Sequence, residues 1–170
     1  MNYTTTLPSP IGNITLCSDG TALTGLWFEG QKHFASTLSQ PYQRCNDLSV
    51  FADTRRWLNC YFGGGIPTFL PALNLIGTPF RQRVWQMLLT IPYSHTASYS
   101  LIANTLGCAS ARAVGNAVAH NPISIIVPCH RVVPRNGTLG GYAGGNERKA
   151  WLLQLENGAQ ASLFPISESK

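Results

Sequence analysis

The chain has 170 residues, of which 44% are hydrophobic and only 11% are charged, and its formal net charge is +5. This length and hydrophobic content allow one good core or two small ones, and no internal repeat or low-complexity segment is present. No apolar run approaches the roughly 18 residues of a membrane span, and the first residues form no charged and apolar leader, so we expect a cytoplasmic protein without a membrane partner.

The positive charge is concentrated in the second half of the sequence. Residues 1–77 carry four basic and four acidic side chains, whereas residues 78–156 carry seven basic and two acidic ones, which leaves an excess of five. Such a surface suits a polyanion, although a solvated basic face gives the same pattern. The five cysteines form no CxxC pair, so no disulfide framework and no metal site is predicted and a reducing compartment fits best; they are Cys17, Cys45, Cys60, Cys108 and Cys129.

Residues 1–77 predict a small structural domain, an antiparallel sheet with a covering helix. Alternating apolar residues predict three strands, and Asp19-Gly20 predicts the turn between the second and the third; the strands are expected at 2–6, 13–17 and 23–28. A short helix is expected over 32–38, ended by Pro41. A longer helix with Ser49 as its cap should end at the glycines of 63–65.

Residues 78–170 predict a mostly helical domain, preceded by a linker over 63–77. Thr78 as cap and Pro79 at the first helical position open a helix that Pro92 ends. Ser98 then caps a short helix with Leu101, Ile102 and Leu106 facing inward. After Gly107, Ser110 caps a further helix that reaches His120. Two short helices around a glycine-containing turn are typical of a helix-turn-helix, here over about 98–120, although many helical hairpins bind nothing.

The second helix of this hairpin is unusually bare. Arg112 is its only long side chain, among Ala111, Ala113 and Gly115, whereas a major-groove reader normally displays several polar side chains. Gly115 costs about 1 kcal/mol of helix stability relative to alanine, so a thin backbone is favoured there. The small residues suit either a close, sequence-indifferent approach to a DNA groove or tight packing against the protein itself.

The run from Ile125 to Val133 places a thiol at the end of a buried apolar stretch, expected to be a strand. Pro128 removes a backbone donor, so the chain can leave its sheet and present Cys129 in a turn. Nearby positive charge from His130 and Arg131 could favour the thiolate. Adjacent strand residues point to opposite faces, so either the chain turns here or His130 reaches the sulfur through a water. Alternatively, Cys129 is a small buried hydrophobe.

The remaining segments frame this turn. Asn121 follows the hairpin and could be only a helix cap. The glycine-rich stretch 137–145 is either a mobile loop or a wall that closely approaches a flat ligand. Asn146 should cap the last helix, with Ala150, Trp151 and Leu153 facing inward and Leu152 as a further candidate. Glu156 lies in its final turn, where the helix dipole disfavours an anion, so either His130 is its partner or it is simply exposed. Residues 157–170 predict a tail.

Taken together, Pro128-Cys129-His130-Arg131, Asn136-Gly137 and the segment from Gly140 to Gly145 resemble the active site of O6-alkylguanine-DNA alkyltransferases. The resemblance covers most of the chain and is strongest over 78–156. It implies an α+β fold, a ribonuclease H-like N-terminal domain and a winged-helix-like C-terminal domain. It also implies a monomer that binds double-stranded DNA containing alkylated bases.

By this resemblance, Cys129 takes an alkyl group from O6-alkylguanine, or from O4-alkylthymine, after the base is flipped out of the duplex. Arg112 would fill the gap in the base stack, with Ser110, Ala111, Ala113 and Gly115 along the minor groove. The resemblance gives the other residues their expected roles: a relay of Cys129, water, His130 and Glu156; proton donation by Tyr99; a pocket of Val132, Tyr142 and Ala143; and a hinge at Asn121.

Such a transfer yields a thioether without an easy leaving group, so a single-turnover reaction without a cofactor is expected. Two departures from the family pattern stand out: Ala143 replaces a serine, and the cysteines and His33 show no zinc-ligand spacing. Three rival hypotheses are a lesion sensor without chemistry, a transcriptional regulator and a cysteine hydrolase. Cys129 argues against the first and the bare second helix against the second, while a hydrolase would turn over.

Overall fold

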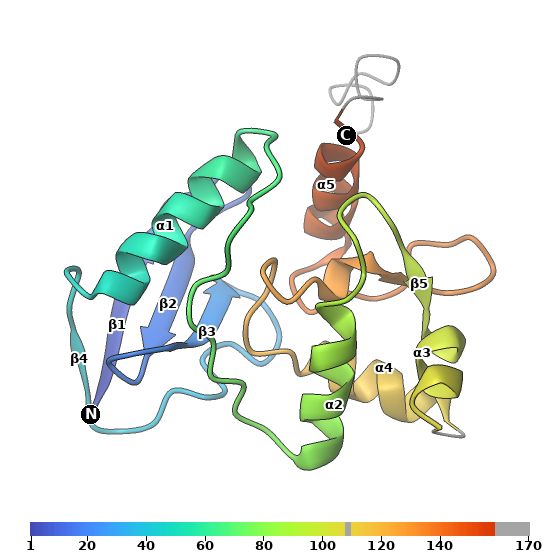
Figure 1. Ribbon diagram of the computed structural model, residues 1–170, viewed down its shortest axis with the longest axis horizontal. Helices are drawn as coiled ribbons and strands as arrows, with labels where there is room; N and C mark the ends of the chain where they lie inside the picture. The colour runs from blue at the N-terminus through green and yellow to red at the C-terminus, as the bar shows by residue number, and fades with distance from the viewer. Residues whose placement is uncertain (108–109, 159–170) are drawn as a thin grey trace.

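The computed structural model describes residues 1–107 and 110–158. The first part of the chain forms a four-stranded sheet in the order β3-β2-β1-β4, covered by helix α1 (Ser49–Phe62) (Figure 1). Strands β1 (Asn2–Leu7), β2 (Ile14–Ser18) and β3 (Leu23–Phe28) are antiparallel neighbours, and the short β4 (Tyr42–Arg44) pairs parallel with β1. The expected antiparallel sheet is therefore present, with one unpredicted parallel strand at its edge.

The second part is mostly helical. Helix α2 (Pro79–Leu88) is followed in the sequence by β5 (Ala97–Ser98), α3 (Tyr99–Thr105), α4 (Ala111–Ala119), the 3-10 helix η1 (Cys129–Arg131) and β6 (Val132–Val133). Strands β5 and β6 pair in parallel. Helix α5 (Asn146–Glu156) completes the described part. The α+β class and the helix-turn-helix are as predicted, while most of the expected tail, 159–170, lies outside the described residues.

The helix starts were predicted only in part. The hydroxyls of Thr78, Ser98 and Ser110 accept hydrogen bonds from the backbone three residues on, as N-caps do. Ser49 and Asn146, in contrast, are the first helical residues, and Leu48 and Gly145 occupy the cap positions without side-chain hydrogen bonds. The predictions that Ser49 and Asn146 are caps were therefore wrong.

The helix expected over 32–38 is absent, and turns occupy this segment. His33 and Ala35 have φ values of +58° and +57°, which no right-handed helix accommodates. Long-range bonds hold the segment instead: Lys32 N–H donates to the Ala143 carbonyl (3.0 Å), and the Thr37 hydroxyl donates to the Thr24 carbonyl (2.8 Å). These tertiary contacts outweigh a helix propensity that is weak in so short a stretch.

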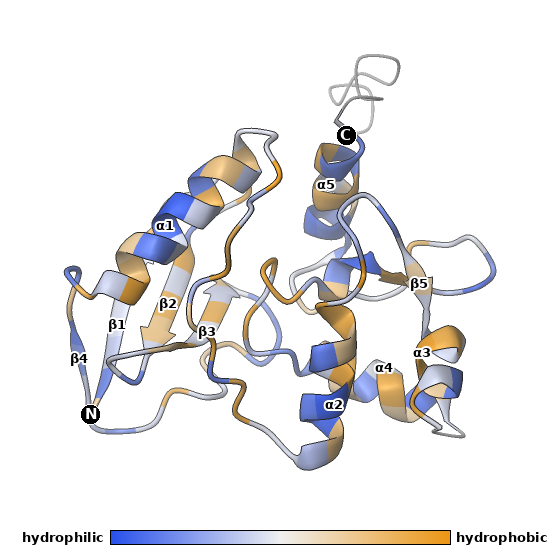
Figure 2. Ribbon diagram, viewed as in Figure 1, coloured by the Kyte–Doolittle hydropathy of each residue, from blue (hydrophilic) through white to orange (hydrophobic). Residues whose placement is uncertain are grey.

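The two halves share one hydrophobic core, to which β2, β3, α1, α2 and α4 all contribute. Figure 2 shows β2 and β3 as largely hydrophobic, whereas the threonine-rich β1 is pale. The expected linker is attached to the sheet, because the Leu23 N–H donates to the Ala72 carbonyl and the Asn74 N–H donates to the Leu23 carbonyl. Leu75 of the same segment is part of the core. On α3, Ile102 is buried, but Leu101 is 55% exposed, contrary to its expected inward position. Across the described residues, no helix is both long and apolar enough to cross a membrane.

Candidate active site

The nucleophile turn, residues 123–131, is buried but is not a strand. Ile125 has a φ of +71°, and successive short-range backbone bonds curl the chain, among them Ile126 N–H to Ser124 O (2.8 Å) and Cys129 N–H to Val127 O (2.8 Å). The expected strand was therefore wrong. Within this turn, Ile123 alone forms a bridge to the sheet, at Leu26. The apolar run therefore correctly indicated a buried segment but not its backbone conformation. Pro128 precedes η1, which begins at Cys129, so the predicted turn at the thiol is present.

Asn121 ties α4 to the nucleophile turn. Its side-chain amide donates to the Val127 carbonyl (2.8 Å), and its side-chain oxygen accepts from the Ile123 backbone N–H (3.0 Å). Asn121 is 4% exposed, so these bonds are shielded from water. Between the two alternatives for Asn121, the geometry favours a fixed joint between the helix and Cys129 over a simple helix cap.

Cys129 lies in an interior that disfavours its anion. The side chain is 3% exposed, and burial raises the pKa of its thiol, while the Asn121 amide, the Lys149 ammonium and the Tyr142 hydroxyl lower it by less. The cation that acts on the sulfur is therefore Lys149, and the expectation that His130 and Arg131 would supply this charge was wrong. The resting thiol is neutral, so its reaction requires a base.

Lys149 is fully buried on the inward face of α5. Its ammonium donates to the carbonyls of Val132 (2.7 Å) and Gly141 (3.0 Å), and burial lowers its pKa to about 8. The buried residues of α5 are Lys149, Leu152, Leu155 and Glu156. Leu152 is therefore inward as expected, and Trp151 packs partly buried against the core, whereas Ala150 and Leu153 are not among the buried residues. Two charged side chains of α5, Lys149 and Glu156, therefore lie inside the protein.

His130 and Glu156 form a buried hydrogen-bonded pair. His130 Nε2 lies 2.5 Å from Glu156 Oε2, as the partner hypothesis for Glu156 predicted. Burial lowers the pKa of His130, and the hydrogen bond and charge of Glu156 only partly offset this. Its other nitrogen, Nδ1, is buried without a protein hydrogen-bond partner in the described part of the chain. A neutral imidazole with a free ring nitrogen can accept a proton.

Glu156 is also bound by Arg131 and Tyr61. Arg131 donates through Nε to Oε1 (2.8 Å) and through Nη2 to Oε2 (3.1 Å), and the Tyr61 hydroxyl donates to Oε2 (2.6 Å). Burial alone would raise the pKa of Glu156, but the hydrogen bonds and charges of His130 and Arg131 lower it to about 2. The carboxylate therefore remains ionised at neutral pH despite being 3% exposed.

A cavity of about 180 Å³ opens next to this cluster. Tyr99, Tyr142, Ala143 and Gly115 line it, so it brings together the expected proton donor, two expected pocket residues and one residue of the expected DNA-binding helix. Cys129 does not itself line the cavity, but two lining residues, Tyr99 and Tyr142, feel its charge: burial and then the charge of Cys129 raise the pKa values of both hydroxyls. Val132, expected in the pocket, is fully buried and does not line it. The remaining lining residues are Lys32, His33, Val118, Ala119 and Gly141.

The glycine-rich stretch forms a wall of this cavity. The carbonyls of Gly141, Ala143 and Gly144 accept bonds from Lys149, Lys32 and Arg148, respectively. Of the two alternatives for this stretch, a mobile loop or a wall, these bonds favour the wall. Ala143 thus contributes a carbonyl to the link with the N-terminal half.

On α4, the exposed first turn and Gly115 bear on the two alternatives for its small residues. Ala111 and Arg112 are exposed in the first turn, and the Ser110 hydroxyl accepts from the Ala113 N–H (3.0 Å). A methyl group added to Gly115 would lie 3.7 Å from the Tyr99 ring, an ordinary contact. Protein packing therefore does not demand glycine at this position. The absence of a side chain instead keeps the cavity open.

Four residues of the site had no individual signal in the sequence. Lys149 looked like part of a charged helix start, and Tyr61 like one more core aromatic residue. Lys32 and His33 reach the cavity only because their segment is not a helix. His33 stacks on His120 at the end of α4, with 3.9 Å between the ring centroids.

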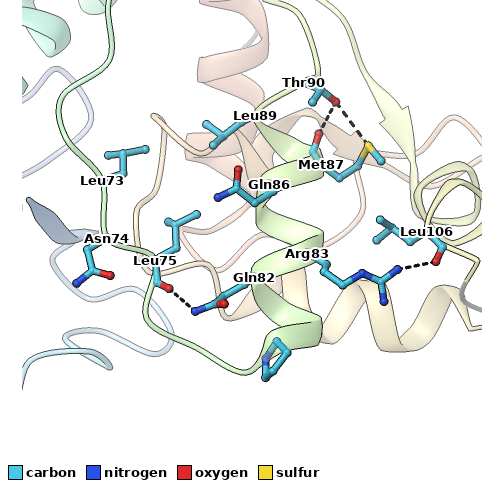
Figure 3. A pocket seen from close by; sticks show the side chains of 11 residues that line it. Leu73, Asn74, Leu75, Gln82, Arg83, Gln86, Met87, Leu89, Thr90 and Leu106 are labelled. Carbon is cyan, nitrogen blue, oxygen red and sulfur yellow. Dashed lines mark hydrogen bonds between the residues drawn. The ribbon is translucent and has the colours of Figure 1, made fainter.

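A larger groove, of about 790 Å³, lies along the outer side of α2 and offers no comparable chemistry (Figure 3). Its side chains are apolar or amide-bearing apart from Arg83 and Thr90, and Arg83 Nη2 is bound to the Leu106 carbonyl (2.8 Å). It contains no thiol, imidazole or carboxylate. Within the described ranges, no three His, Cys, Asp or Glu side chains gather as a metal site.

Both halves of the chain match models of one protein family. Residues 2–70 match the family model "6-O-methylguanine DNA methyltransferase, ribonuclease-like domain", and residues 79–158 match the model "6-O-methylguanine DNA methyltransferase, DNA binding domain". The methylated-DNA–protein-cysteine methyltransferase of Mycobacterium tuberculosis is 46% identical over 157 residues, covering 89% of this chain and 90% of the relative. That of Haemophilus influenzae is 40% identical, covering 91% and 86%.

A solved structure is similar over nearly the whole chain. The crystal structure of Mycobacterium tuberculosis OGT in complex with DNA has a TM-score of 0.83 and 45% identity, covering 92% of this chain and 93% of that one. The N-terminal sheet, its helix and the helical second half are therefore arranged as in that protein.

Proposed function

The chain belongs to the 6-O-methylguanine DNA methyltransferase family, and on that premise we propose that it repairs DNA by moving the alkyl group of O6-alkylguanine onto its own Cys129. The single observation that carries the assignment to Cys129 is the buried thiol beside a cavity, with a neutral histidine, an ionised glutamate and a lysine around it. O4-alkylthymine is a second candidate substrate.

The proposed reaction begins with removal of the thiol proton. His130 Nδ1 accepts this proton through a bridging water, and Glu156 stabilises the imidazolium that forms. Lys149 stabilises the thiolate as its charge appears. The neutral resting states of the thiol and the imidazole, set by burial, make proton transfer part of the reaction instead of a prior equilibrium.

The thiolate then attacks the alkyl carbon. A carbon–sulfur bond forms, the carbon–oxygen bond breaks, and the electron pair of that bond stays on the guanine oxygen. Tyr99 remains a phenol at neutral pH, because burial raises its pKa, and it donates a hydrogen bond to the departing base. The guanine anion then takes up one proton and the His130 imidazolium gives up one, so that overall the thiol proton replaces the alkyl group on the base.

The product is a thioether, which cannot be cleaved by water at a useful rate. Among the described residues around Cys129, none would remove an alkyl group from sulfur, so the proposed stoichiometry is one transfer per molecule. One chain holds every group of this mechanism. We therefore propose a monomer that needs no second subunit and no cofactor and acts in the cytoplasm.

The substrate must leave the duplex to reach the thiol. Base extrusion costs a few kcal/mol, less where a lesion already weakens pairing. Helix α4 borders the cavity through Gly115 and exposes Arg112 in its first turn. Arg112 is proposed to occupy the place of the extruded base, with Ser110, Ala111, Ala113 and Gly115 along the minor groove.

The test is transfer from a duplex that carries radiolabelled O6-methylguanine, followed by proteolysis. Label should appear on the peptide containing Cys129, at no more than one methyl group per molecule. Cys129→Ser should bind the duplex but acquire no label, and Cys60→Ser, a change in another free cysteine, should react as the wild type does. Label that stays on DNA excludes the transfer, and several turnovers would indicate a hydrolase.

A further inference from the structure

Tyr61 brings the N-terminal half of the chain into contact with the proposed relay. It lies on the last turn of α1, at the end that approaches α5 (Figure 1). Its hydroxyl donates to Glu156 Oε2 (2.6 Å) and lies 3.4 Å from His130 Nε2, and its side chain is fully buried. A buried tyrosine hydroxyl needs a hydrogen-bond partner, and here that partner is the same carboxylate that binds His130.

Three donors share a single oxygen of Glu156. Oε2 accepts from Tyr61 (2.6 Å), lies 2.5 Å from His130 Nε2, and accepts from Arg131 Nη2 (3.1 Å). A carboxylate oxygen offers about two lone-pair sites, so these donors compete for the same negative charge. Each hydrogen bond to Oε2 reduces what Glu156 can give to the imidazole.

The other groups around His130 do not substitute for this effect. Lys149 of α5 and Arg131 of η1 both disfavour the imidazolium through their charge, while Glu156 favours it. Tyr93, between α2 and β5, and Tyr142, in the glycine-rich stretch, face the same cluster, and burial raises the pKa of each hydroxyl. Tyr93 donates to the Leu155 carbonyl instead of to Glu156.

We propose that Tyr61 is a positioning residue that limits the proton affinity of His130 by holding part of the charge of Glu156 in its hydrogen bond. The proposal rests on the function proposed above. In the absence of this bond, Glu156 gives more charge to the imidazole, and His130 is protonated at higher pH. A protonated His130 cannot accept the thiol proton, so the acidic limb of the transfer rate moves upward in pH.

The test compares Tyr61→Phe with the wild type and with Tyr93→Phe. Each change removes one tyrosine hydroxyl near Glu156 and keeps the ring. The single-turnover rate of transfer from an O6-methylguanine duplex is measured between pH 5.5 and 9. Tyr61→Phe should raise the apparent pKa of the acidic limb by about one unit, the usual scale for a hydrogen bond to a charged group. Tyr93→Phe should leave the limb in place.

Two further measurements separate this role from a structural one and from failure of the proposed function. The pKa of the His130 ring, followed by NMR without substrate, should rise by a similar amount in Tyr61→Phe. This readout needs no alkyl transfer. If Tyr61→Phe does not fold, 2,3-difluorotyrosine placed at position 61 alone makes a stronger donor and should shift the limb and the ring pKa downward. An unchanged limb and ring pKa in either Tyr61 variant would overturn the proposal.

Discussion

Burial keeps the Cys129 thiol neutral at rest, while the nearby Lys149 ammonium can stabilise the thiolate once it forms. Burial raises the pKa of Cys129, while Lys149, whose pKa is lowered to about 8, still carries most of its charge at neutral pH. A neutral resting thiol is also less open to oxidation than a thiolate. This balance suits a protein that reacts once, because a residue spent on a wrong electrophile is lost.

Glu156 should make the fold sensitive to acid. Its pKa is about 2 in the folded protein against an ordinary value of 4.5, so this group contributes stability that is fully present above about pH 4.5 and is lost as pH falls toward 2. The difference corresponds to at most about 3 kcal/mol. We expect the free energy of unfolding, measured by urea denaturation at stepwise lower pH, to fall through this window in the wild type and to fall clearly less in Glu156→Gln.

Asp19 provides the matched control for this measurement. Its pKa is also lowered to about 2, by hydrogen bonds from the turn that follows β2, but it is exposed to solvent. Solvent screening should make its contribution small. Asp19→Asn should therefore keep most of the acid sensitivity, and a curve flattened by Asp19→Asn but unchanged in Glu156→Gln would contradict the assignment.

At the level of single residues, site residues that are neighbours in the sequence could be predicted, whereas those that only the fold places near Cys129 could not. Cys129 and His130 are adjacent, so their chemistry could be recognised without a structure. Lys149 and Tyr61 reach the site from other elements, 20 and 68 residues away in the sequence. A lysine in a charged helix start normally indicates a solvated face, so only tertiary contacts reveal that this one is buried.

At the level of elements, local chemistry predicted the caps of α2, α3 and α4 but not the segments held by distant contacts. Thr78, Ser98 and Ser110 act on backbone groups three residues away, so the signal and its effect are both local. Segments 32–38 and 123–127, in contrast, are fixed by hydrogen bonds and packing against β3, Ala143 and Asn121. Apolar periodicity carries no information about such partners.

Gly115 lowers the stability of helix α4 and, because it has no side chain, leaves space in the cavity that it lines. A methyl group there meets only the Tyr99 ring at 3.7 Å, and alanine gains about 1 kcal/mol of helix propensity. We therefore expect Gly115→Ala to raise the melting temperature yet to slow transfer from an O6-methylguanine duplex, by about ten-fold as for one methyl group misplaced in a binding pocket. Calorimetry and single-turnover kinetics measure the two effects.

The control for this prediction is Asn59→Ala, an exposed position on α1. It also gains helix propensity but lies on an element that does not line the cavity. It should stabilise the protein without slowing transfer. Equal transfer rates for Gly115→Ala and the wild type would show that the missing side chain has no role in substrate access.

At the level of the whole molecule, several contacts between the two halves lie close to Cys129 and Glu156. Leu26 of β3 exchanges backbone bonds with Pro122 and Ser124 (2.8 and 3.0 Å), next to the nucleophile turn. Arg148 of α5 donates to the Ile11 carbonyl (2.8 Å), and Tyr61 of α1 donates to Glu156. The N-terminal half, in which basic and acidic side chains balance, lines the cavity through Lys32 and His33 and therefore supports the shape of the site.

Because these contacts cross between the halves and the core is shared, we expect the described part of the chain to unfold as one cooperative unit. The measurement is hydrogen exchange by mass spectrometry over a urea series, following a peptide from β2 and a peptide from α4. The two peptides should lose protection at the same urea concentration, with the same dependence on urea. Two separate transitions would mean that the halves are independently stable, and the contacts of Tyr61 and Leu26 would then be too weak to transmit stability from the sheet to Cys129.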